Sequence, residues 1–366
     1  MRKTSVAIIL HGLSRNGIDM LMASLAERWD YSRFDVTYLL AVDPGTPQLM
    51  EEKVRAAGAR IVHLHDLNRG RWILWPFTLR KALKKYGPFD AAYYHMYFLN
   101  GINAWAAKKV GIPVRICHAH TVSHPNEGKI GRRIYKMIMR RQIVRNSTEL
   151  VSCSKLAGRY FYKDHTYQVI FNGIDLQKFA PEDETIRKRG VRFITVSRLH
   201  EQKNPFFLLE VIGELICLIP EATLDWAGDG PAKEAIIKKI QELHLGNTVH
   251  LLGDRQDVDC LLKQHDYFLF PSLYEGLGSA LIEAQATGLD CFISDTIPEE
   301  ADCGKCRRIS LSKGAGEWAA EIAEHVRSGQ TMHVDPDKLS NYDIDHMARI
   351  LMKMFSGKDM HVNKTP

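Results

Sequence analysis

The sequence has no apolar run long enough to cross a bilayer. Its most hydrophobic stretch, residues 205–220, is interrupted by Glu210 and Glu214, whereas a membrane-spanning helix needs about 20 predominantly apolar residues. We therefore expect no transmembrane segment. Residues 1–12 combine a charged start with a short apolar run but lack a small-residue cleavage site. We expect a buried first strand there rather than a signal peptide.

Cysteine is scarce and forms no metal-binding pattern. There are seven cysteines among 366 residues, which suggests thiols in a reducing cytoplasm. The C-G-K-C segment at 303–306 has zinc spacing but lacks a second pair, so we do not expect a metal site there. The chain also lacks G-x-G-x-x-G after its first apolar stretch, because H-G-L-S-R-N-G at 11–17 has a different spacing. This absence argues against a dinucleotide-dependent dehydrogenase.

The charges are divided unevenly along the chain. The net charge is +6, but residues 1–180 hold 28 Lys and Arg against 13 Asp and Glu, and the remainder holds 21 against 30. A basic half joined to an acidic half indicates two domains with different electrostatic partners. The basic half could face phosphate groups, nucleic acid or an anionic membrane.

Apolar stretches rich in β-branched residues alternate with helical patterns, which predicts an α/β protein with two doubly wound parallel sheets. The expected strands are 5–12, 35–41, 60–65, 90–95 and 114–120, and then 192–199, 223–230, 248–254, 266–272 and 290–295.

The boundary between the two domains is expected in the polar, proline-containing stretch 176–190. We predict an N-terminal Rossmann-like domain at 1–180 and a C-terminal one at 181–340. Residues 341–366 then form a last helix and a polar tail.

Two glutamates flank a predicted helix start in P-S-L-Y-E-G-L-G-S-A-L-I-E, residues 271–283. Glu275 follows a strand of the second sheet, at the edge where α/β sheets bind ligands. The helix start attracts anions, and carboxylates accept hydrogen bonds from hydroxyls. A nucleotide sugar would fit, with its sugar at Glu275, its diphosphate at 277–280 and its ribose at Glu283. The residues between the two carboxylates that we expect to meet it are Gly276, Leu277, Gly278 and Ser279.

A second basic segment points to the same ligand. Arg198 and Lys203 follow the first strand of the second sheet, where a guanidinium and an ammonium could neutralise a diphosphate leaving group. Arg255 could approach the nucleotide base. The glycine turn W-A-G-D-G-P at 226–231 is by itself a weak signal.

These motifs resemble those of the retaining glycosyltransferases of family 4, which have the two-domain GT-B fold with two Rossmann-like domains facing across a cleft. The resemblance covers nearly the whole chain and is most specific at the E-x7-E pattern of Glu275 and Glu283. S-R-L-H-E-Q-K-N at 197–204 looks like the family's diphosphate-binding pair. H-A-H-T at 118–121 resembles the strand end that brings a histidine, here His120, to the sugar. N-G-I-D-M-L at 16–21 looks like the glycine loop of the first domain, with Gly17 as its remaining glycine.

The resemblance implies a hexosyltransferase that retains the anomeric configuration and needs no metal or other cofactor. Its donor is a nucleotide sugar, with UDP expected, and its acceptor a glycan or a lipid-linked glycan of a bacterial capsule or exopolysaccharide. Glu275 would orient the donor sugar, Arg198 and Lys203 would stabilise the leaving diphosphate, and His120 would contact the sugar or its phosphate. The last helix would cross back to the first domain.

Several other signals have ordinary explanations or remain open. The D-x-D segments at 257–259 and 343–345 are interpreted as helix caps rather than metal ligands. The basic amphipathic stretches 69–85 and 128–146 favour a cytoplasmic protein that docks peripherally on the inner face of a membrane. We expect no nucleic-acid partner. A nucleotide-sugar epimerase of the same fold, or a non-catalytic protein that binds polyanions or polysaccharides, remains an alternative.

Overall fold

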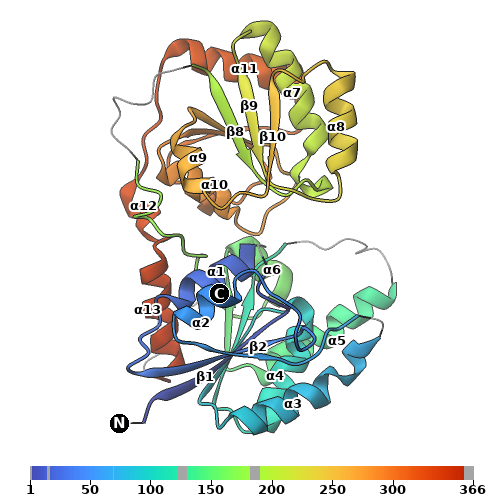
Figure 1. Ribbon diagram of the computed structural model, residues 1–366, viewed down its shortest axis with the longest axis vertical. Helices are drawn as coiled ribbons and strands as arrows, with labels where there is room; N and C mark the ends of the chain where they lie inside the picture. The colour runs from blue at the N-terminus through green and yellow to red at the C-terminus, as the bar shows by residue number, and fades with distance from the viewer. Residues whose placement is uncertain (1, 15–16, 69, 123–129, 182–189, 358–366) are drawn as a thin grey trace. The chain divides into compact units, whose positions relative to one another are not determined.

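The computed structural model describes residues 2–14, 17–68, 70–122, 130–181 and 190–357. The chain forms two compact units, one of residues 1–173 with 343–366 and the other of residues 174–342 (Figure 1). Residues 182–189 of the expected linker lie outside the described part. The division falls at Gly173, slightly before the stretch in which the sequence places it.

The first unit contains a parallel sheet of seven strands in the order β3-β2-β1-β4-β5-β6-β7. Its strands are β1 (Thr4–Leu10), β2 (Phe34–Leu40), β3 (Arg60–His63), β4 (Ala91–Tyr94), β5 (Val114–Ala119), β6 (Glu149–Ser152) and β7 (Gln168–Val169). Its helices are α1 (Gly17–Ala26), α2 (Glu51–Ala56), α3 (Trp75–Tyr86), α4 (Asn100–Lys109), α5 (Ile130–Asn146), α6 (Lys155–Tyr162) and α13 (Ile344–Phe355), with the 3-10 turns η1 (Arg71–Leu74) and η2 (Tyr97–Leu99).

Helices cover both faces of this sheet, because side chains alternate along each strand. On β1, Val6 and Ile8 pack in one cluster with residues of α1, α2 and α13. Ala7 and Ile9 face the opposite cluster with residues of α3, α4 and α6. The last helix therefore belongs to the core of the first unit, although it follows the second unit in the chain.

The second unit contains a parallel sheet of six strands in the order β10-β9-β8-β11-β12-β13. Its strands are β8 (Arg192–Val196), β9 (Thr223–Ala227), β10 (Val249–Gly253), β11 (Tyr267–Phe270), β12 (Asp290–Ser294) and β13 (Cys306–Ile309). Its helices are α7 (Pro205–Leu218), α8 (Lys233–Glu242), α9 (Val258–Lys263), α10 (Ser279–Ala286), α11 (Ala315–Ser328) and α12 (Pro336–Ser340), with the 3-10 turns η4 (Glu201–Lys203) and η5 (Glu299–Ala301).

The predicted α/β class with two parallel sheets is confirmed, and all ten predicted strands are present. Three strands were not predicted, namely β6, β7 and β13. β7 and β13 lie at sheet edges, where one side of the strand stays unpaired and the apolar pattern is weak. Among the described helices, none is long and apolar enough to pass through a bilayer.

Each sheet has a point at which the strand order reverses. It lies between β1 and β4 in the first unit and between β8 and β11 in the second. Connections leave such neighbouring strands in opposite directions, so the carboxyl ends of the strands border a crevice where α/β proteins bind ligands. The loops after β8 and β11 carry Arg198, Lys203 and Glu275, and the segments after β4 and β5 carry His95 and His120.

Candidate functional site

Hydrogen bonds through Gln202 join the two loops at the switch point of the second sheet. The Gln202 carbonyl oxygen accepts from the amide of Leu273 at 2.8 Å. Its side-chain Nε2 donates to the carbonyl oxygen of Tyr274 at 2.8 Å. The loop after β8 is thereby fixed against the loop after β11. The sequence analysis did not identify Gln202, because a glutamine in a polar loop carries no distinctive pattern.

Lys203 and Glu275 form an ion pair inside this junction. The Lys203 ammonium donates to Oε1 of Glu275, and the two side chains are only 16% and 8% exposed. The ammonium also lies 4.7 Å from the centre of the Phe270 ring. Two charges withdrawn from water are stable mainly through each other. A ligand with an anionic group and hydroxyls could therefore engage both charges as it binds.

The glycine turn between β9 and α8 supports the backbone on either side of Arg198, whose side chain is exposed. A Cβ atom on Gly228 would lie 2.0 Å from the carbonyl oxygen of Ser197, and one on Gly230 would lie 2.5 Å from that of Leu199. Gly228 also has a φ of +141°. Only glycine allows these backbones to approach so closely. The sequence analysis rated this turn as a weak signal, and its packing role depends on a contact that composition does not encode.

Helix α10 begins immediately after the glutamate loop. Gly278 stands at its N-cap in the left-handed conformation, with a φ of +88°, and Gly288 follows its end with a φ of +85°. The predicted helix with glycine at each end is confirmed. Ser279 is the first helical residue, whereas Leu277 is buried and anchors the loop in the core. The first amides of α10 and its dipole are available at the same edge as the Lys203–Glu275 pair, an arrangement suited to a phosphate.

Glu283 lies one turn into α10 and is partly exposed. Burial raises its pKa to about 7, with Asp259 raising it further and Lys178 opposing the shift. Lys178 is itself paired with Asp259 at 3.0 Å. At neutral pH the Glu283 carboxyl is therefore divided between its neutral and charged forms, so it can both donate to and accept from a hydroxyl.

We expect Glu283 to make folding stability depend on pH. Because its pKa is raised from 4.5 to about 7, the folded protein holds a proton that the unfolded chain has already released in this interval. Stability should therefore fall as the pH rises from about 4.5 through 7. In Glu283→Gln this loss should be smaller. Melting temperatures of both proteins across this range test the prediction, and parallel curves would contradict it.

Three secondary interpretations can be compared with the structure. Asp343 caps α13 as predicted, accepting from the amide of Asp345 at 3.0 Å. The cap prediction is wrong for Asp257, which stands at the N-cap of α9 without a side-chain cap bond. Its carboxylate instead holds the Arg255 guanidinium at 2.5 and 2.8 Å, because a bidentate pair is stronger than a cap. Burial raises the pKa of Cys303 to about 12, so the C-G-K-C segment contains an unreactive thiol.

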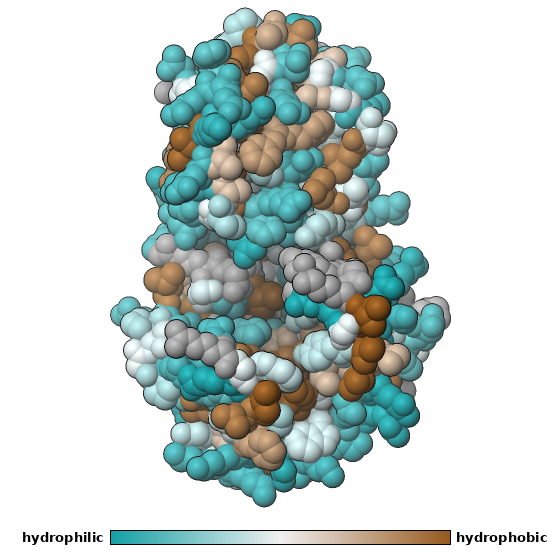
Figure 2. All heavy atoms as spheres, turned by 90° about the vertical axis from the view of Figure 1, so that its right-hand side faces the viewer, coloured by the Kyte–Doolittle hydropathy of each residue, from teal (hydrophilic) through white to brown (hydrophobic). Residues whose placement is uncertain are grey.

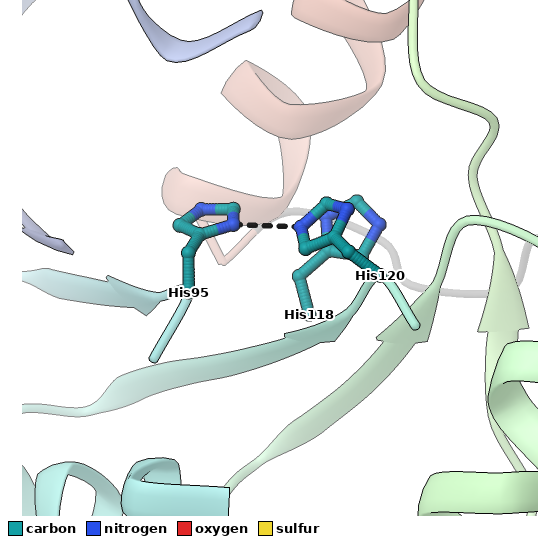
Figure 3. Close-up of side chains that lie close together, drawn as sticks. All are labelled: His95, His118 and His120. Carbon is teal, nitrogen blue, oxygen red and sulfur yellow. Dashed lines mark hydrogen bonds between the residues drawn. The ribbon is translucent and has the colours of Figure 1, made fainter. Parts of the chain in front are cut away.

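In the first unit, His120 belongs to a chain of hydrogen bonds, of which Figure 3 draws the one to His95. Its Nδ1 lies 3.1 Å from Oδ1 of Asn172, and its Nε2 lies 2.8 Å from Nδ1 of His95. An amide oxygen only accepts, so the proton of His120 sits on Nδ1, and Nε2 accepts from His95. Both ring nitrogens of His120 are thus engaged within the protein. The sequence analysis did not single out His95, although this residue ends the predicted strand 90–95, and it did not single out Asn172.

The third imidazole of this cluster is that of His118, whose Nδ1 lies 2.5 Å from the Tyr93 hydroxyl. Ring nitrogens of His95, His118 and His120 lie within 4.8 Å of one another, the one set of side chains in the described residues that could hold a metal ion. In the present arrangement, the bond between His95 and His120 uses the lone pair that a metal would need. Burial lowers the pKa of all three histidines, that of His120 to about 4.

We expect this histidine cluster to weaken the fold in acid. Below the ordinary histidine pKa of 6.5, the unfolded chain binds protons that buried His120, with its pKa of about 4, does not. Stability should therefore decrease as the pH falls from 6.5 towards 4. His120→Gln should make this decrease shallower. Denaturant titrations at several pH values measure it, and an unchanged slope would contradict the prediction.

Gly17 begins α1, and a Cβ atom there would meet no heavy atom within 4 Å. Asn16, the other residue of the predicted glycine loop, lies outside the described residues. Buried Asp19 accepts from the amide and hydroxyl of Ser14 at 2.8 and 2.6 Å. The sequence analysis did not single out Asp19, although an Asp in the first turn of a helix is a common anchor for the preceding loop.

Two protein families match this chain over adjoining regions. The family described as glycosyl transferases group 1 matches residues 177–308. The family described as glycosyltransferase family 4 matches residues 15–178. The predicted resemblance to family 4 is confirmed by these matches.

Individual proteins give the same result. A Bacillus subtilis (strain 168) protein named as glycosyltransferase EpsF is 33% identical over 338 residues, 88% of each chain. An Escherichia coli protein named UDP-Gal:alpha-D-GlcNAc-diphosphoundecaprenol alpha-1,3-galactosyltransferase is 30% identical over 241 residues, 60% of each chain. The crystal structure of Anabaena HepE in complex with UDP-glucose has the same fold, with a TM-score of 0.78 at 16% identity over 96% of this chain and 99% of that one.

Proposed function

Because the chain belongs to the glycosyltransferases of group 1 and family 4, we propose that it transfers a hexosyl unit from a UDP-sugar to a glycan or lipid-linked acceptor, with retention of the anomeric configuration. The observation that carries the proposal is the Lys203–Glu275 pair at the switch point of the second sheet, next to the start of α10. Nothing in the packing of a sheet edge requires a buried ammonium, a buried carboxylate and a helix start at one place.

In the proposed complex the donor diphosphate lies at the start of α10. Lys203 moves from the Glu275 carboxylate to a phosphate oxygen, and Arg198 supplies a second positive charge. Glu275 then accepts hydrogen bonds from hydroxyls of the donor sugar, and Glu283 from those of the ribose. The charge of the leaving UDP grows in the transition state, so these fixed cations accelerate transfer more than they tighten ground-state binding. Because they meet that charge, we propose that transfer needs no metal or other cofactor.

The transfer itself breaks the bond between the anomeric carbon and the phosphate oxygen and forms one to the acceptor oxygen on the same face. The acceptor proton passes to an oxygen of the departing UDP, so UDP and the new glycoside are the products. Glu275 orients the sugar and forms no covalent bond in this scheme. His120 lies in the first unit, where its ring is held by His95 and Asn172. Its contact with the donor sugar or phosphate stays a prediction from the family resemblance.

The choice of donor and acceptor rests on the related proteins. Anabaena HepE was crystallised with UDP-glucose. The name of the Escherichia coli relative specifies a UDP-sugar donor and a diphosphoundecaprenol-linked acceptor. We therefore place the reaction in the assembly of a cell-surface polysaccharide, with a lipid-linked glycan as the acceptor to be tried first.

The test compares ligands and variants by thermal stability. A ligand at a hundredfold excess over its Kd stabilises the folded protein by about 2.7 kcal/mol, so UDP should raise the melting temperature, whereas GDP, ADP and NAD should not. Arg198→Ala/Lys203→Ala should abolish the shift. NMR of UDP-sugars incubated with and without acceptor then distinguishes transfer from epimerisation, which would change the sugar without an acceptor. Equal responses to all four ligands would reject the proposed site.

A further inference from the structure

The first unit contains a cavity that the sequence analysis did not predict. Its volume is about 920 Å³, and it is lined from η1 by Trp72, from η2 by Tyr97 and from α5 by Arg132, Tyr135 and Lys136. All of these elements belong to the first unit. Aromatic rings and cations thus line the same cavity, which suits a ligand with both an anionic group and an apolar part.

Lys136 is the most unusual residue of this lining, because a charged residue is here only 9% exposed. Its ammonium donates to the Tyr160 hydroxyl at 2.7 Å. It also lies 5.2 to 6.0 Å from the ring centres of Tyr160, Phe98 and Tyr97. Aromatic faces and a hydroxyl both favour an ammonium that is withdrawn from water. A phosphate group in the cavity could accept a charge-assisted hydrogen bond from this ammonium.

Exposed apolar side chains gather on the same side of the unit. Of fifteen large apolar side chains exposed among the described residues, eight lie in only two segments. These eight are Trp72, Ile73, Leu74 and Phe77 on η1 and α3, and Ile130, Ile134, Met137 and Ile138 on α5. Both segments border the cavity, since Trp72 and Arg132 line it together. We call these eight residues the apolar face. Figure 2 shows brown, apolar side chains standing among teal, polar ones on the first unit.

Positive charge surrounds the apolar face. Helix α5 carries six Lys and Arg and helix α3 carries four, and neither contains an acidic residue. A second hollow of about 470 Å³ along α5 is lined by Arg140, Arg141 and Arg145 with Lys163. Apolar side chains flanked by cations are typical of proteins that lie in the interface of anionic membranes, and each cation near such a surface adds to the attraction.

We propose that the apolar face docks on an anionic lipid bilayer, which brings the cavity beside Lys136 to the phosphate of a lipid-linked acceptor. The acceptor part of this inference rests on the proposed function, whereas the docking does not. The combination of positive charge and apolar side chains favours a bilayer over a second copy of the chain or a nucleic acid as the partner of the apolar face. Two copies of so basic a surface repel each other. A nucleic-acid backbone is charged and hydrated, so it would not bury the eight exposed apolar side chains.

Vesicle flotation tests the docking. The full chain is mixed with vesicles of phosphatidylcholine alone or of phosphatidylcholine with phosphatidylglycerol. We expect flotation with the anionic vesicles and little with the neutral ones. Ile130→Ser/Ile134→Ser/Met137→Ser should reduce anionic-vesicle binding at least tenfold, and so should Arg133→Gln/Arg141→Gln. All five side chains are exposed, so these replacements leave the core of the unit intact.

A matched control lies in the second unit. Leu218→Ser/Ile237→Ser and Lys238→Gln also replace exposed apolar and basic side chains, and both should float like the wild type. UDP binding, measured on every sample, reports on the proposed function independently. Equal flotation with neutral and anionic vesicles, or undiminished binding by both α5 variants, would overturn the docking proposal whatever the UDP result. Lost UDP binding with normal flotation would contradict only the donor site.

Discussion

Replacing Lys203 with alanine is expected to lower kcat by about 100-fold to 1,000-fold, the effect of removing one preorganised group that stabilises developing charge. The physical reason is the position of its ammonium, which is held beside Glu275 and the start of α10 by the junction of two loops. Initial rates of UDP release with a UDP-sugar and acceptor measure the effect. KM for the donor should change less than kcat, because the charge that Lys203 meets grows in the transition state.

This variant also leaves Glu275 buried without its cation, which can cost about 3–5 kcal/mol of stability. Lys203→Gln/Glu275→Gln avoids that problem, because two neutral amides can hydrogen-bond to each other in the same space. The double variant should fold and remain inactive. Lys313→Ala is the control, since Lys313 pairs with Glu321 on the surface of the same unit and exposed pairs contribute little. Near-normal activity of a folded double variant would contradict the assigned role.

The second large effect is expected at the glycine turn. Gly228→Ala should destabilise the second unit by about 3 kcal/mol, since its Cβ atom would lie 2.0 Å from the Ser197 carbonyl oxygen at a φ of +141°. For a unit of this size the loss corresponds to roughly 6–12 °C in Tm. UDP binding should fall as well, because relieving the clash displaces the loop that carries Arg198. Calorimetry and UDP titration at low temperature measure the two effects separately.

Gly213→Ala is the matched control and should act in the opposite direction. Gly213 lies within α7, and a Cβ atom there meets no heavy atom within 4 Å. Alanine should therefore stabilise this helix by about 0.5–1 kcal/mol. If Gly228→Ala were as stable as the wild type, the supporting role of the turn would be disproved.

The features that could be predicted from the sequence are those set by residues close together in the chain. Most strands of both sheets carry continuous apolar runs because helices bury both of their faces, so ten of the thirteen described strands were visible in the residues alone. The short edge strands β7 and β13 were not visible, because they bury less. Likewise, the glycines at both ends of α10 and the Asp cap of α13 are local signals, and both predictions agree with the structure.

The partners of several polar side chains could be identified only from the tertiary structure. The sequence alone determined two parallel α/β units, the E-x7-E segment and the basic segment at 198–203. It did not show that Gln202 ties two loops together, that Asp257 binds Arg255 rather than capping its helix, or that His95 and Asn172 occupy both nitrogens of His120. For Gln202 and His95 the partner is set by which strands are neighbours in a sheet, whereas Asp257 and Arg255 lie two residues apart and pair within one loop. A residue pattern reports the burial and backbone conformation of its own segment, whereas the partner of a polar side chain depends on how the whole sheet is ordered.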